Sequence, residues 1–190
     1  MIIDISQEIL SCKVYPGDPE PVLEKICDME KGEVYKLTAF SMCAHNGTHV
    51  DAPAHFLKDG KTIDEIPLEY FVGDCYVIRE EGKLSAADAK RILAITDGIE
   101  RILLAGDLVV TAEAARVFAE AGIKLLGNES QSVGPEEAPM EVHKILLEAG
   151  VILLEGIVLK DVEEGKYFLN AAPLNIAGCE GAPCRAYLLK

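Results

Sequence analysis

The sequence contains no tryptophan, only four histidines, and far fewer basic than acidic residues. Its 18 lysines and arginines stand against 32 aspartates and glutamates, which gives a formal net charge of −14. A chain this acidic has no basic face to neutralise phosphates, so nucleic-acid binding is not expected. Attraction to anionic membrane surfaces is disfavoured for the same reason.

Long apolar runs are also absent. No stretch reaches the roughly 20 apolar residues that span a bilayer, and residues 1–6 lack the basic and apolar regions of a signal peptide. None of the six cysteines forms a C-x-x-C pair, which argues against a zinc ribbon or a thioredoxin-like site. We therefore expect a cytoplasmic protein with reduced thiols and no membrane partner.

A chain of 190 residues, 49% of them hydrophobic, can bury one core, so we expect a single domain over 1–190. The first half favours strands at 2–9, 21–29, 33–43 and 73–79. The second half favours helices at 85–95, 111–121 and 139–149, with Ser85 and Thr111 as N-caps, and strands at 101–105, 123–127, 151–155, 167–171 and 185–189. This alternation is typical of an α/β domain whose mixed sheet contains parallel β-α-β units.

Three of the four histidines and one aspartate lie within residues 45–55. They are His45, His49, Asp51 and His55. Imidazole and carboxylate groups suit Zn, Mn or Fe(II). Gly47 and Pro53 disfavour a helix here, and in an extended segment the side chains at odd positions point to one side. The segment therefore predicts a metal site on an extended chain; the alternative is a chance cluster of histidines.

The same residues carry a resemblance to a known family. They match the H-x-G-T-H-x-D-x-P-x-H signature of the cyclase-like metal-dependent hydrolases at every fixed position from His45 to His55. This family includes bacterial kynurenine formamidase and isatin hydrolase. A Y-P-G-D turn at 15–18 also matches, and the resemblance covers nearly the whole chain. It implies a swivelling β/β/α architecture for the domain.

The resemblance also implies a set of metal ligands. His45, His49 and Asp51 would hold a first divalent ion, Zn or Mn. Asp51 and Glu155 would bridge to a second ion, which His143 would complete. One or two ions per subunit are consistent with this set. Taken alone, His143 is typical of a helix surface, and Glu155 of a strand end that faces solvent.

Three further residues receive roles. The resemblance leaves His55 free of metal as the catalytic acid and base, a task that suits an imidazole. Tyr15 stands where kynurenine formamidases carry a tryptophan that contacts substrate, so it would bind substrate; the alternative is a tyrosine that covers a turn. Thr48, between two ligands, would orient a carboxylate.

The activity implied is hydrolysis of an amide C–N bond, linear or cyclic, in a small molecule, with N-formylkynurenine as the first candidate. The resemblance also implies a homodimer or homotetramer. The alternatives are a metal-dependent cyclase or dehydratase acting on an oxygenated substrate, a non-catalytic metal-binding protein, and a structural metal site. Two segments depart from the family: 105–111 is short and lacks an arginine, and 127–132 carries Glu129 in place of an aspartate. These departures concern the substrate rather than the metal.

Overall fold

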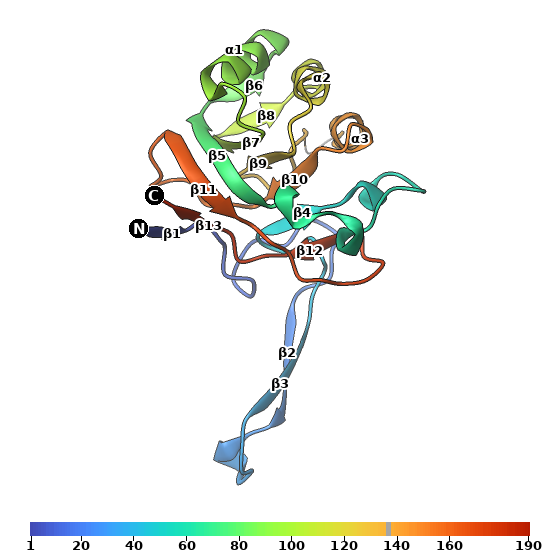
Figure 1. Cartoon of the computed structure of the whole chain (residues 1–190). Helices are drawn as coiled ribbons and strands as arrows, with labels where there is room; N and C mark the ends of the chain where they lie inside the picture. The colour runs from blue at the N-terminus through green and yellow to red at the C-terminus, as the bar shows by residue number, and fades with distance from the viewer. Residues whose placement is uncertain (136–137) are drawn as a thin grey trace.

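A curled, mixed sheet of nine strands forms the body of the computed structural model, which describes residues 1–135 and 138–190 (Figure 1). The strands are β1 (Ile2–Asp4), β4 (His49–Asp51), β5 (Val72–Arg79), β7 (Arg101–Ala105), β9 (Leu125–Asn128), β10 (Ile152–Glu155), β11 (Gly165–Asn170), β12 (Gly181–Pro183) and β13 (Tyr187–Leu189). Their order is β1-β13-β11-β5-β7-β9-β10-β4-β12. β5, β7, β9 and β10 are parallel neighbours, and antiparallel strands flank them. The predicted α/β fold class with a mixed sheet is confirmed.

Three helices cover one face of this sheet (Figure 1). They are α1 (Ala86–Thr96), α2 (Ala112–Ala121) and α3 (Met140–Glu148). Ser85 and Thr111 cap α1 and α2 as predicted, because each hydroxyl accepts a hydrogen bond from a backbone N–H of the first turn. Shorter elements are the 3-10 helices η1 (Met29–Lys31), η2 (Pro53–His55), η3 (Ile63–Glu65) and η4 (Leu68–Tyr70), and the paired strands β6 (Gly82–Leu84) and β8 (Leu108–Val110). Within the described ranges, no helix is both long and apolar enough to cross a membrane.

Apolar side chains are buried on both faces of the sheet. Along β7, Ile102 and Leu104 pack toward the helices, whereas Leu103 and Ala105 belong to the core on the opposite face. Alternate residues of a strand point to opposite faces, so a strand covered on both sides has to be apolar throughout. This explains why the central strands β7, β9 and β10 are mostly apolar, with polar residues at their ends.

The opening strand is shorter than predicted. We expected a strand over 2–9, but β1 ends at Asp4. Ile5 still donates its N–H to the backbone carbonyl of Ala186 at 3.0 Å, but the next two N–H groups have side-chain acceptors: the Ser6 N–H donates to Asp4 Oδ1 at 3.1 Å, and the Gln7 N–H donates to Thr48 Oγ1 at 2.9 Å. The chain thereby leaves the sheet edge and passes beside the turn that precedes β4.

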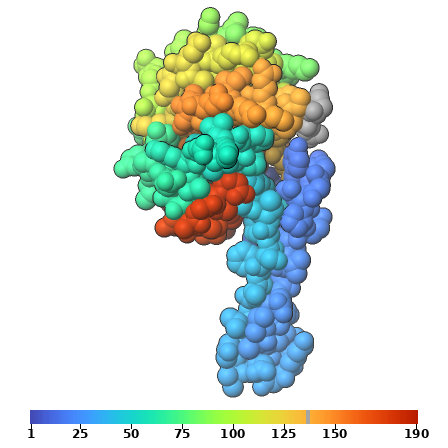
Figure 2. Space-filling view, turned by 90° about the vertical axis from the view of Figure 1, so that its right-hand side faces the viewer, coloured from blue at the N-terminus to red at the C-terminus, as the bar shows by residue number. Residues whose placement is uncertain are grey.

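The strands predicted at 21–29 and 33–43 form, in shorter versions, a hairpin that stands away from the body. Its strands are β2 (Val22–Cys27) and β3 (Leu37–Ser41), which pair with each other in a sheet of two strands. We call residues 22–41 the arm; it projects from the domain as a separate column (Figures 1 and 2). Several apolar side chains of the arm are at least 45% exposed: Val22, Leu23, Ile26, Val34, Tyr35, Leu37 and Phe40.

A buried arginine fixes the start of β7. Arg101 is only 7% exposed, and its guanidinium donates to the backbone carbonyls of Glu69, Tyr70 and Asp74. Gly73 lies against it, since a Cβ there would come within 2.8 Å of the guanidinium carbon. One side chain thus satisfies the carbonyls at the end of η4 and links them to the central sheet.

Replacing Arg101 with methionine is expected to lower the free energy of unfolding by about 3 kcal/mol, because buried carbonyl groups lose charged donors. Urea denaturation would measure the change. Arg116→Met is the matched control, because the Arg116 guanidinium pairs with Glu141 at the surface and should contribute little. Equal midpoints for the two variants would contradict the structural role of Arg101.

Candidate metal centre

The antiparallel neighbours β4 and β10 bring two carboxylates and an imidazole together. In their register, Glu155 lies opposite His49. Asp51 is two residues further along β4, so it points to the same face as His49. His49 Nε2 lies 3.4 Å from Asp51 Oδ1 and 3.5 Å from Glu155 Oε2. All three side chains are almost completely buried.

The extended conformation predicted for 45–55 is wrong outside β4. His45 lies in a turn in which Gly47 has φ 66°, and His55 ends the 3-10 helix η2. Pro53 starts that helix, and it has no N–H with which to continue a strand ladder. The turn and the helix bring both ends of the segment back over β4. His45 Nδ1 consequently lies 2.7 Å from Asp51 Oδ1.

The helix α3 adds His143 from the other side of the cluster. The side chain is buried, not on the helix surface, and its Nδ1 lies 2.8 Å from the carbonyl oxygen of Pro139. Its Nε2 is 3.3 Å from Glu155 Oε1 and 3.7 Å from Asp51 Oδ2. Glu155 is also buried rather than facing solvent, and its Oε1 accepts the N–H of Val133 at 2.7 Å.

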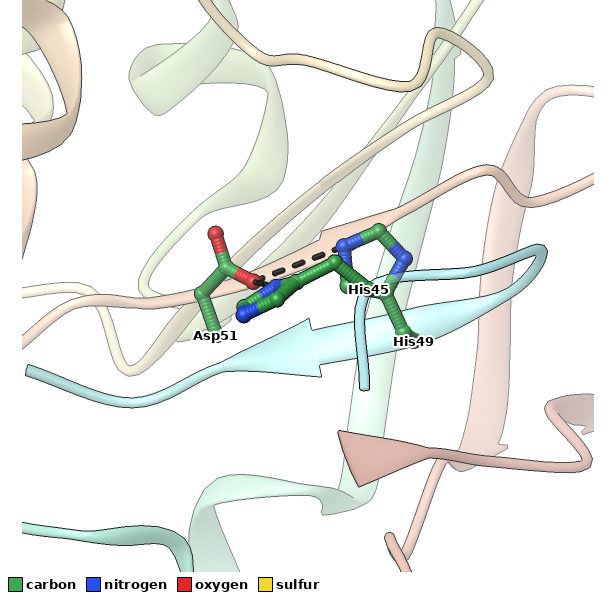
Figure 3. A group of neighbouring side chains, drawn as sticks. All are labelled: His45, His49 and Asp51. Carbon is green, nitrogen blue, oxygen red and sulfur yellow. Dashed lines mark hydrogen bonds and ion pairs between the residues drawn. The ribbon is translucent and has the colours of Figure 1, made fainter. Parts of the chain in front are cut away.

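Asp51 belongs to two groups of possible metal ligands. His45, His49 and Asp51 have ligand atoms that lie within 4.8 Å of one another, and so do Asp51, His143 and Glu155. Figure 3 shows the first group, in which the three side chains turn toward one another. Asp51 Oδ2 is buried and accepts no hydrogen bond from the described residues. Such an oxygen is costly to bury unless a ligand completes it, and a donor set of imidazoles and carboxylates suits a divalent metal ion.

The charges of the cluster favour a cation. Burial opposes the charged form of His49, but the hydrogen bonds and negative charges of Asp51 and Glu155 outweigh it and raise the pKa of His49 to about 10. The pKa of His143 is also raised, because the interaction with Glu155 exceeds the effect of burial. The carboxylates that stabilise protonated imidazoles would equally stabilise a divalent ion in this place.

His55 stands beside the two ligand groups and belongs to neither. Its Nε2 is 4.0 Å from Asp51 Oδ2, and its ring stacks on that of His45 with centroids 4.1 Å apart. The side chain is 28% exposed. Burial and the neighbouring His45 and His143 lower the pKa of His55, although Asp51 acts in the opposite direction. His55 is therefore the imidazole most readily neutral at pH 7.

A cavity of about 250 Å³ opens beside the cluster. Its wall includes Tyr15 and Phe56, whose rings offer apolar surface, and Gln131, whose amide is polar. Asp18 and Cys43 line it as well. Tyr15 is thus placed at the cavity, as a substrate contact has to be. The cavity is large enough for a single aromatic ring with a short side chain.

Thr48 has another partner than predicted, and Glu129 binds two backbone N–H groups. Among the described residues the Thr48 hydroxyl bonds no carboxylate; it donates to the carbonyl of Gly156 at 2.6 Å and holds the turn before β4 against the end of β10. Glu129, in the altered 127–132 segment, accepts the N–H of Gly106 at 2.8 Å and that of Leu159 at 2.7 Å. Its carboxylate therefore closes the short 105–111 loop onto the residues after β10.

Sequence reasoning missed Glu180. Its Oε1 lies 3.4 Å from His45 Nε2, and its backbone leads directly into β12. No periodicity or local motif marks this glutamate, because its contact with His45 spans 135 positions of the chain. Only a prediction that β12 pairs with β4 could have indicated Glu180.

Comparisons with known proteins agree with this geometry. The model of the family described as "Putative cyclase" matches residues 3–110. Over 98% of the chain, the sequence is 35% identical to a kynurenine formamidase of Salinibacter ruber and 33% identical to one of Erythrobacter litoralis, with 96% and 93% of those proteins covered. A solved structure described as a potential metal-dependent hydrolase with cyclase activity superposes with a TM-score of 0.82 at 30% identity, covering 99% of this chain and 96% of that one.

Proposed function

The chain belongs to the cyclase family, and from this premise we propose that it hydrolyses the amide C–N bond of a small aryl formamide with the help of a divalent metal ion. One observation carries the proposal: two groups of possible ligands share Asp51, which has a buried oxygen without a hydrogen-bond partner in the described part of the chain. The kynurenine formamidases similar to this chain over nearly its full length support the same chemistry.

Of the one or two ions, Zn or Mn, that the sequence predicted, we propose two, because there are two groups of possible ligands. His45, His49 and Asp51 would hold the first; Asp51, His143 and Glu155 would hold the second. A carboxylate can bridge two cations and reduce their repulsion, and Asp51 stands where the two groups meet. When bound, such ions supply a water of lowered pKa, from about 15.7 toward about 7, and polarise an amide carbonyl.

The protein's own groups orient the substrate and move the proton. Tyr15 and Phe56 offer ring surface in the cavity wall, against which an aryl group can stack. His55 presents Nε2 toward the ligand groups. In its neutral form this nitrogen takes the proton of the attacking water and then returns it to the leaving nitrogen of the amide. N-formylkynurenine is the first named substrate we propose, with related aryl formamides and cyclic amides next.

The test combines metal analysis with a substrate screen. The purified protein should contain Zn or Mn and should hydrolyse at least one member of a panel of aryl formamides and cyclic amides. Chelation should remove the activity before it unfolds the chain, which distinguishes a catalytic from a structural site. Loss rather than addition of water in the product would favour a cyclase or dehydratase, and bound metal without any turnover would favour a binding protein.

We also propose that the chain forms a homodimer through the arm, or a homotetramer built from such dimers. The arm is a two-stranded sheet with both edges open, and an isolated hairpin of this kind is marginally stable in water. A second arm related by a twofold axis presents the same apolar side chains, so the contact can be self-complementary.

We further propose a cytoplasmic location for the protein. Its six cysteines are free thiols, which supports this location.

Charges placed on the arm are expected to separate the subunits. Leu23 and Phe40 lie opposite each other in the arm, and replacing both with aspartate should yield a folded monomer in sedimentation velocity, where the unaltered chain sediments as a dimer or tetramer. Ile95→Asp is the control, because Ile95 is 42% exposed on α1, away from the arm. An unaltered chain that sediments as a monomer would refute the assembly.

A further inference from the structure

Glu180 is held beside the first group of ligands by its backbone. Its carbonyl oxygen accepts the N–H of Ala52 at 2.8 Å, immediately after β4. The next residue, Gly181, is paired with Asp51 in the register of β12 and β4. The carbonyl of the preceding Cys179 accepts the N–H of Ile63 at 2.8 Å. Backbone hydrogen bonds on both sides of Glu180 therefore fix the position of its Cα atom.

The two ring nitrogens of His45 face two different carboxylates. Nδ1 is 2.7 Å from Asp51 Oδ1, and Nε2 is 3.4 Å from Glu180 Oε1. The two nitrogens flank Cε1, so their bonding directions diverge. The nitrogen turned to Asp51 lies against a member of its own ligand group, whereas Glu180, at the other nitrogen, belongs to neither group. A histidine that binds a metal through one nitrogen commonly donates the proton of the other to a carboxylate.

The ring of His45 also has little freedom to turn. The His55 ring lies against it, with the two ring planes tilted by 32°. Gly181 lies at the edge of the ring, where a Cβ would come within 2.7 Å of His45 Cε1 and within 2.8 Å of the carbonyl oxygen of Val50. Only a glycine at this position leaves room for the ring in its present place. Gly181 thus leaves space for the His45 ring, and Glu180, the residue before β12, places a carboxylate near its Nε2.

We propose that Glu180 is a positioning residue, which accepts a hydrogen bond from His45 Nε2 and thereby presents Nδ1 to the metal ion held with His49 and Asp51. The proposal rests on the function proposed above. Glu180 has no contact with the second group of ligands among the described residues. Its effect is therefore confined to one of the two ions, which distinguishes it from a general electrostatic influence of an acidic surface.

Metal affinity tests this role without recourse to activity. Titration of the metal-free protein with Zn²⁺ against a chelating indicator should resolve two binding steps in the unaltered chain. Glu180→Ala should weaken one step by about 10- to 100-fold and leave the other unchanged. Glu180→Gln should lose less, because the amide oxygen still accepts a hydrogen bond. Glu148→Ala, which removes an exposed carboxylate from α3, is the charge control and should change neither step.

Nitrogen-15 NMR of the histidine rings in the Zn²⁺-bound protein gives a second readout. The His45 ring should carry its proton on Nε2, protected from exchange, and this protection should be lost in Glu180→Ala. Gly181→Ala should weaken the same binding step, because its Cβ displaces the ring. Equal loss at both steps, or less than threefold loss in Glu180→Ala with its helical and sheet signals intact, overturns the assignment. An unaltered chain that binds no ion would instead overturn the proposed function, and this role with it.

Discussion

Asp51→Asn is expected to abolish metal binding and to reduce amide hydrolysis by at least about 1000-fold. Losing an outer-shell partner of a metal site costs roughly 10- to 100-fold, and Asp51 stands inside both ligand groups. The amide keeps the size of the side chain, but it removes the negative charge and places an NH₂ group among imidazoles. Metal analysis and initial rates on an aryl formamide would measure the two effects together.

The matched control for this prediction is Asp18→Asn. Asp18 lines the same cavity but belongs to neither ligand group. Its variant should retain the full metal content, although substrate affinity can change. Thermal unfolding monitored by circular dichroism would show that Asp51→Asn still folds. Activity that survived the loss of the Asp51 carboxylate would refute a reaction centred on this residue.

The sequence predicted which donor groups meet at this site better than it predicted the conformation of the chain there. His45, His49, Asp51 and His55 could be proposed together because they are neighbours in the chain and have suitable donor groups. The argument from an extended strand holds for β4 alone, since a turn and a 3-10 helix flank it. Proximity along the chain does not specify these bends; they depend on how Pro53 and Gly47 close the chain over β4.

The more distant residues required other information. His143 and Glu155 could be placed near the segment only through the resemblance to a family, because nothing local shows that α3 and β10 pack against β4. Nothing in the sequence indicated Glu180, because its position depends on the pairing of β12 with β4. The second half of the fold was easier to predict. Caps such as Ser85 and Thr111 act within one turn, so the sequence alone indicates where those helices begin.

His55→Gln is expected to separate proton transfer from metal binding. The variant should keep its full metal content, because His55 belongs to neither ligand group. Its turnover should fall by about 100- to 10,000-fold, the usual contribution of a positioned acid or base. His45→Gln is the matched comparison: it alters a histidine of the same segment that lies in a ligand group, and it should lose metal and activity together. Loss of metal in both variants would refute the distinction.

The leaving group reveals which proton His55 moves. Formanilides with electron-withdrawing ring substituents release a less basic nitrogen, which depends less on protonation. If His55 Nε2 returns the proton to that nitrogen, the loss of rate in His55→Gln should shrink steadily along such a series. If His55 acts only on the attacking water, the loss should be the same for every member. We expect the first result, because Nε2 faces the ligand groups from the edge of the cavity, where both the water and the departing amine lie within reach.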